Sequence, residues 1–146
     1  MALQEIHSRN LIKAHDNEVC IRILRPHSSH WKPPPENKPT SAAYDDNIGE
    51  LSVDLADTYP SKTQLEQIYS DKIQSNGIGL SCAITVNIRS ELVNKTIDGN
   101  VWKDPIPDNS SHGIITGNRN KKKKEALRDI FNVEIPPKNI QEIFGQ

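Results

Sequence analysis

The sequence lacks long apolar runs, and hydrophobic and aromatic residues make up only 34% and 5% of its 146 positions. A membrane-spanning helix needs roughly 20 consecutive apolar residues, and the apolar stretches here are a few residues long. The first residues also lack the basic-then-apolar layout of a secretory signal peptide. We therefore expect a cytoplasmic protein without membrane contact, organised as one domain over residues 1–146 with a small core.

An excess of charge of one sign is also missing. Eighteen basic and nineteen acidic side chains leave a formal net charge of −1, which excludes a general electrostatic attraction to nucleic acid or anionic lipid. Only a local patch could support such binding. No complete nucleotide-binding or nucleophile motif is present, and we expect no cofactor.

Cysteine is scarce, with Cys20 and Cys82 both lying in apolar, strand-like runs. A free cysteine in such a place usually behaves as a small buried hydrophobe. A disulfide would require the two strands to be neighbours, and two cysteines in a chain without an export signal make it the less favoured interpretation.

The hydrophobic periodicity predicts alternating strands and helices. Ser61 and Gln64 form a capping-box pattern ahead of the first helix. The predicted strands span 19–24, 51–55, 78–86, 101–102 and 112–116, and the helices span 62–74, 86–94 and a final segment that begins with the lysines after residue 120. This order predicts an α+β fold with one small mixed sheet, helices packed on one side and long proline-rich loops.

Three segments lack clear periodicity: a lead-in over 1–17, a long loop over 25–50 and a C-terminal tail over 132–146. The loop contains five prolines between Arg25 and Asn47. We expect it to be ordered, because a large aromatic residue such as Trp31 normally folds back onto the body of a protein.

The most specific stretch runs from Lys38 to Leu55, where a polar loop leads into an alternating strand. Its polar side chains, together with a histidine that opens a later strand, form a candidate polar pocket of Thr40, Ser41, Tyr44, Asp45 and His112. Ser41, His112 and Asp45 or Asp46 include the residue types of a nucleophilic triad. Asp45, Asp46 and Asp54 could instead bind a divalent ion. We favour a third interpretation, in which these side chains bond the loop's own backbone.

His112 could act as a general base, although such a histidine more often bonds neighbouring backbone. His27, His30 and His112, with Cys20, contain metal-ligating side chains. The spacing His27-Ser-Ser-His30 is a weak signal, and we expect no metal.

Four lysines begin the final helix, where the helix dipole prefers negative charge. This conflict predicts an anion-binding site formed by Asn118, Arg119, Lys121, Lys122, Lys123 and Lys124. The favoured alternative is a solvated face on which Glu125 and Asp129 compensate the lysines.

Several motifs resemble a family of small bacterial proteins of uncharacterised function. The matching segments are Ile21-Arg22-Ile23, Trp31, Lys38-Pro39-Thr40-Ser41-Ala42-Ala43-Tyr44, Leu51-Ser52-Val53, Asp104-Pro105 and Ser111-His112-Gly113-Ile114-Ile115-Thr116-Gly117. The resemblance covers about residues 19–131, with mild departures at Lys38, Tyr44, Ser111 and Gly113. It implies no reaction, and it associates such proteins with larger bacterial defence or conflict proteins.

The leading hypothesis is a small accessory protein that acts by binding, as a subunit of a larger bacterial assembly with a role in antiviral defence. One alternative is an enzyme or nucleotide-binding domain that uses the region of Thr40, Ser41 and His112. Another is nucleic-acid binding through Lys121 to Lys124.

Overall fold

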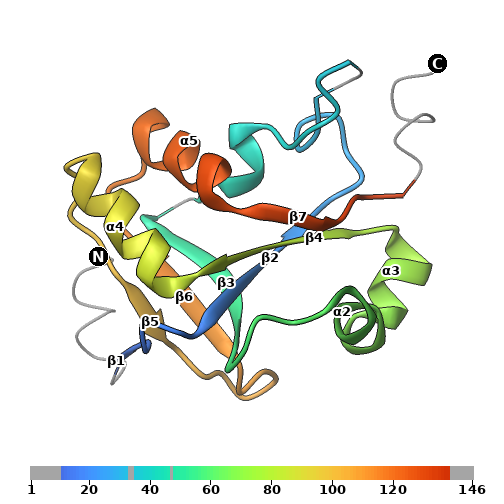
Figure 1. The fold of residues 1–146 in the computed structure, drawn as a ribbon, viewed down its shortest axis with the longest axis horizontal. Coiled ribbons are helices and arrows are strands. Elements are labelled where there is room, and N and C mark those ends of the chain that lie inside the picture. Colours follow the sequence, from blue (N-terminus) through green and yellow to red (C-terminus); the bar gives the residue numbers. More distant parts are fainter. Residues whose placement is uncertain (1–10, 33–34, 47, 139–146) are drawn as a thin grey trace.

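A single seven-stranded sheet forms the centre of the molecule (Figure 1). The computed structural model describes residues 11–32, 35–46 and 48–138. In chain order the strands are β1 (Ile12–Lys13), β2 (Val19–Leu24), β3 (Glu50–Ala56), β4 (Gly79–Ile84), β5 (Val101–Lys103), β6 (His112–Thr116) and β7 (Asn132–Ile135). Their order across the sheet is β1-β5-β6-β3-β2-β4-β7.

The α+β class is confirmed, but every pairing in this sheet is antiparallel, where the sequence predicted a mixed sheet. Strand β3 is followed by two helices and then β4, an order that normally produces a parallel pair. Here β2 lies between β3 and β4 and pairs with both. The two strands therefore run parallel to each other without being neighbours.

Helices cover both faces of the sheet, which corrects the prediction of helices on one side. The 3-10 helix η1 (Ser41–Tyr44), α4 (Thr85–Asn94) and α5 (Lys121–Ile130) pack on one face around Tyr44, Leu92 and Leu127. Helices α2 (Lys62–Ile68) and α3 (Ser70–Asn76) pack on the other around Leu65 and Ile73. Figure 1 shows these two groups on opposite sides of the central strands. The core therefore has two parts, separated by the sheet.

The helix predicted over 62–74 is present but interrupted. It begins at the predicted capping box, in which Ser61 and Gln64 exchange side-chain and backbone hydrogen bonds. It breaks at Tyr69, whose backbone departs from helical geometry (φ −107°, ψ 19°). The Tyr69 hydroxyl donates to Asp54 on β3, a tertiary contact that local sequence does not reveal.

The predicted strands 19–24 and 112–116 match β2 and β6. The predicted strand 78–86 ends at Ile84, and α4 begins at Thr85, with Ile84 as its N-cap. Strand β1 lies within the predicted lead-in, and β7, which pairs with β4, lies within the predicted tail. Residues 139–146 of that tail are outside the described residues, as are residues 1–10 of the lead-in.

The long loop contains ordered structure around Trp31. This side chain is 3% exposed, donates to Asn37 and sits opposite Pro39 in an isolated β-bridge. The prediction that the aromatic residue folds back is confirmed. Cys20 and Cys82 are free and buried, as predicted. No helix within the described residues is long and apolar enough to span a membrane.

Candidate functional site

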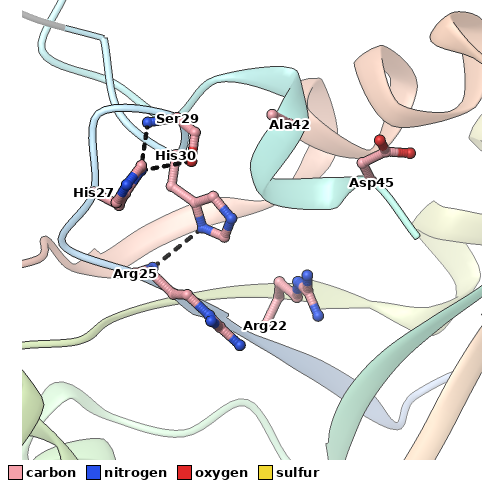
Figure 2. A pocket seen from close by; sticks show the side chains of 7 residues that line it. All are labelled: Arg22, Arg25, His27, Ser29, His30, Ala42 and Asp45. Carbon is pink, nitrogen blue, oxygen red and sulfur yellow. Dashed lines mark hydrogen bonds between the residues drawn. The ribbon is translucent and has the colours of Figure 1, made fainter. Parts of the chain in front are cut away.

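A pocket of about 320 Å³ opens where β2 ends and the long loop begins. Strand β2 and the residues after it contribute one side, and η1 with the residue that follows it contributes the other. The lining residues are Arg22, Arg25, His27, Ser29, His30, Ala42 and Asp45. Figure 2 shows the two arginine side chains beneath the His30 ring, with Asp45 across from them. The pocket is therefore rich in cationic and N–H donor groups.

Arg22 holds the two sides of the pocket together. Its Nε donates to the main-chain oxygen of Ala43 at 3.0 Å, and its Nη1 donates to that of Ser52 at 3.0 Å. Burial lowers the pKa of this guanidinium, but an arginine stays charged at neutral pH. Arg25 is exposed at the pocket rim. The pocket thus combines one anchored and one accessible positive charge.

The two histidines present their Nε2 atoms as donors. The main-chain N–H of Arg25 donates to His30 Nδ1 at 3.2 Å, and that of Ser29 donates to His27 Nδ1 at 3.0 Å. A ring nitrogen that accepts a hydrogen bond carries no proton, so each neutral ring has its proton on Nε2. Burial, reinforced by Arg22, Arg25 and His27, lowers the pKa of His30 to about 4. His30 is therefore a neutral hydrogen-bond donor at pH 7.

Among the described residues, Asp45 is the one acidic residue that lines the pocket, and its charge is compensated from outside the pocket. Arg119 donates to its two carboxylate oxygens at 3.0 and 2.9 Å, and Lys124 Nζ lies 4.0 Å away. The hydrogen bond from Arg119 is the main reason that the pKa of Asp45 is lowered. The one acidic side chain opposite Arg22 and Arg25 is thus already paired with another arginine.

Three cationic side chains of the predicted anion-binding segment, those of Arg119, Lys123 and Lys124, lie against carboxylates of this chain. Lys123 is 1% exposed, and its Nζ donates to Asp46 at 2.7 Å and to the main-chain oxygens of Ile115 and Gly117. Asp45 and Asp46 thus provide the compensation that the sequence analysis assigned to Glu125 and Asp129. Within the lysine run, Lys121 and Lys122 remain exposed.

The residues of the predicted polar pocket lie in different places. Tyr44 is fully buried and donates to Ser81 at 2.9 Å, and burial raises its pKa to about 12. Thr40 donates to the main-chain oxygen of Ser29. Asp45 is the member of the predicted set that lines the pocket described above.

His112 lies on the opposite face of the sheet from η1. Side chains alternate between the two faces of the sheet along β6, so His112 lies on the face opposite Ile115. Ile115 belongs to the hydrophobic cluster that contains Ala43 and Tyr44 of η1. The His112 ring contacts Asp104 and Ser52 instead. The sheet therefore separates His112 from Ser41, and the triad of Ser41, His112 and an η1-proximal aspartate does not assemble.

No group of three or more His, Cys, Asp or Glu side chains among the described residues is arranged to hold a metal ion. His27 and His30 both use Nδ1 for main-chain contacts. Asp54, the third member of the candidate carboxylate cluster, accepts from Tyr69 and from Asn109.

Sequence reasoning missed the arginines of this site. The signal is the pattern Arg22-Ile-Leu-Arg25 followed by His27-Ser-Ser-His30, which places two cations and two imidazoles at one strand end. The chain matches no protein-family model, no curated protein and no solved structure. Inference about function therefore depends on the site's own chemistry.

Proposed function

We propose that this chain is a binding protein whose pocket takes a phosphate or carboxylate group. The supporting observation is that Arg22, Arg25, His27 and His30 all line one cavity of about 320 Å³. Guanidinium groups recognise such anions with paired, charge-assisted hydrogen bonds. The volume is at the lower end of small-ligand pockets, and it suits a terminal anionic group better than a whole nucleotide.

We further propose that the anionic group belongs to a larger partner, so that the chain acts as an accessory subunit of an assembly. The pocket is open at the rim formed by Arg25 and His27, which are both exposed. A role in bacterial antiviral defence stays a prediction that follows only from the resemblance described above.

The test is calorimetric titration of the protein with inorganic phosphate and with acetate. Arg25 is the residue to change, because it is exposed and is not one of the groups that hold the loop. We expect Arg25→Gln to weaken phosphate binding about ten-fold, since it removes one charge-assisted contact. The matched control is Arg128→Gln, because the Arg128 side chain pairs with Asp129 on α5. This variant should bind phosphate as the wild type does.

Two results would count against this function. One is wild-type protein that binds neither anion at millimolar concentration in low salt. The other is an Arg25→Gln variant that binds as tightly as the wild type, which would place the anion elsewhere.

Binding of nucleic acid through the lysine run has weaker support. Lys123 is buried against Asp46, and Lys124 and Arg119 lie beside Asp45. This leaves Lys121 and Lys122 as the exposed lysines of the run, and a two-phosphate contact produces only a shallow dependence of affinity on salt.

A further inference from the structure

Three polar side chains form a line across adjacent strands on the face that carries α2 and α3. Ser52 comes from β3, His112 from β6, and Asp104 directly follows β5. These three strands are neighbours in the order β5-β6-β3. His112 pairs with Asp54 in the register, so Ser52 is its diagonal neighbour, within reach of a long side chain.

The hydrogen bonds fix the state of the imidazole. His112 Nδ1 lies 2.9 Å from the main-chain oxygen of Asp104 and 3.4 Å from its carboxylate Oδ2. Because both of these oxygens are acceptors, Nδ1 carries the proton of the neutral ring. The lone pair is then on Nε2, which lies 3.3 Å from Ser52 Oγ. The Ser52 hydroxyl therefore donates to a ring nitrogen that is ready to accept its proton.

Burial supports the same roles. Asp104 is 7% exposed, so its carboxylate can stabilise an imidazolium with little screening by solvent. The His112 side chain is 16% exposed, and Ser52 faces solvent. Exposure therefore increases from the acid Asp104 through the base His112 to the hydroxyl of Ser52. A site with a nucleophile, a base and an orienting acid requires this order.

We propose that Ser52, His112 and Asp104 form a serine-hydrolase-type site that accepts esters of carboxylic acids. This site lies on the opposite face of the sheet from η1, and Arg22 of the anion pocket contacts only the main-chain oxygen of Ser52 among its three residues. Ile114, the cross-strand partner of Ser52, also pairs with Trp102 on β5. Of the apolar members of this cross-strand row, Ile114 is buried and Trp102 is partly exposed, so the Trp102 ring is the apolar surface near the hydroxyl, which favours aryl esters.

The reaction proceeds in two balanced steps. Ser52 Oγ attacks the ester carbonyl carbon while its proton passes to His112 Nε2; the bond to the alcohol oxygen then breaks, and the alcohol leaves with that proton. A water molecule next attacks the acyl group on Ser52 and gives a proton to Nε2. The carboxylic acid is released, and Ser52 recovers its proton from Nε2. No oxidant, reductant or metal ion is consumed.

The test is covalent labelling of the full chain with an aryl fluorophosphonate, followed by intact mass measurement and peptide mapping. We expect one adduct on Ser52, and no adduct on the Ser52→Ala variant. His112→Gln should react about 100-fold more slowly, since general-base catalysis typically contributes a factor of 10² or more. The rate of phenyl acetate hydrolysis should decrease in the same order, from the wild type through His112→Gln to Ser52→Ala.

Ser111→Ala is the matched control, because Ser111 is also exposed and is adjacent to His112 in sequence. It should label at the wild-type rate. Circular dichroism establishes that each variant is folded. Absence of an adduct on folded wild-type protein, an adduct elsewhere, or an unchanged rate in folded His112→Gln would overturn the proposal.

Discussion

At the scale of single residues, the least expected contact is the buried pair of Lys123 and Asp46, whose side chains are 2% and 4% exposed. Four lysines at a helix start oppose the helix dipole. Here the third of them turns into the core and meets a carboxylate and two main-chain oxygens. The lysine run is thus partly structural: it fastens α5 to the loop that follows η1.

Removing one partner of this pair should leave an unpaired buried charge. We expect Lys123→Met to lower the free energy of unfolding by about 3–5 kcal/mol, measured by urea denaturation. Lys122→Met, at the exposed neighbouring position, should change it by less than about 0.5 kcal/mol. The double variant Lys123→Met with Asp46→Asn should recover part of the loss, because no charge remains buried. A loss similar to that of Lys122→Met would contradict this account.

His30 predicts a pH dependence of stability. Its pKa is about 4 in the folded protein against 6.5 as the ordinary value. Between these pH values the unfolded chain binds a proton that the folded protein excludes, so stability decreases as the pH falls from 6.5 to 4. The shift corresponds to at most about 3 kcal/mol, which solvent around the partly exposed ring reduces to about 1–2 kcal/mol.

Urea unfolding at pH 7 and pH 4.5 measures this effect. His30→Gln should lose less stability on acidification than the wild type, and His15→Gln, at an exposed position, should behave as the wild type does. Equal losses in the wild type and His30→Gln would show that His30 is not responsible.

At the scale of elements, local signals located most strands and helices, and tertiary contacts decided the rest. Strand 19–24 has alternating apolar residues and matches β2, and strand 112–116, with Ile114 and Ile115 at its centre, matches β6. Strands β1 and β7 are two and four residues long, too short for periodicity to identify. They form because neighbouring strands offer them unpaired backbone groups.

The candidate site was predictable only in part, for a related reason. His112 was recognisable from its place at the start of a strand, but its partners depend on the register between β3 and β6. Shifting this register by one residue would move Ser52 to the other face. Likewise, the arginines of the pocket are evident in the sequence. The position of η1 on the other side of the pocket depends on a tertiary contact, the hydrogen bond from Arg22 to the main-chain oxygen of Ala43.

The capping box of α2 gives a prediction at this scale. Ser61 accepts from the main-chain N–H of Gln64 at 3.1 Å, and Gln64 accepts from that of Ser61 at 2.8 Å. We expect Ser61→Ala to lower the free energy of unfolding by about 1 kcal/mol, measured by thermal and urea denaturation. Ser75→Ala, at an exposed position within α3, should be neutral or slightly stabilising. If both variants lose the same amount, the cap is not the cause.

At the scale of the whole molecule, one sheet connects two cores that share no side chains. Strand β2 sends Cys20 and Leu24 into the cluster beneath α4 and α5, and Val19 and Ile21 into the cluster beneath α2 and α3. Strand β4 likewise sends Ala83 to the first cluster and Cys82 to the second. Because the same two central strands supply both clusters, we expect the cores to unfold together.

The two cysteines allow a direct test, since each reports on one core. Burial raises the pKa of both thiols to about 12, so neither should react with an aryl disulfide at pH 8 while the protein is folded. For a domain with about 5 kcal/mol of stability, labelling that requires unfolding is slowed about a thousand-fold or more. Cys82→Ala leaves Cys20 as the reporter of the first cluster, and Cys20→Ala leaves Cys82 as the reporter of the second.

After correction for each variant's own stability, the thiol of each variant should become reactive over the same range of urea concentration in which that variant loses its circular dichroism signal. Reaction of Cys82 at lower urea would mean instead that α2 and α3 open while the other face, with the anion pocket and α5, stays folded.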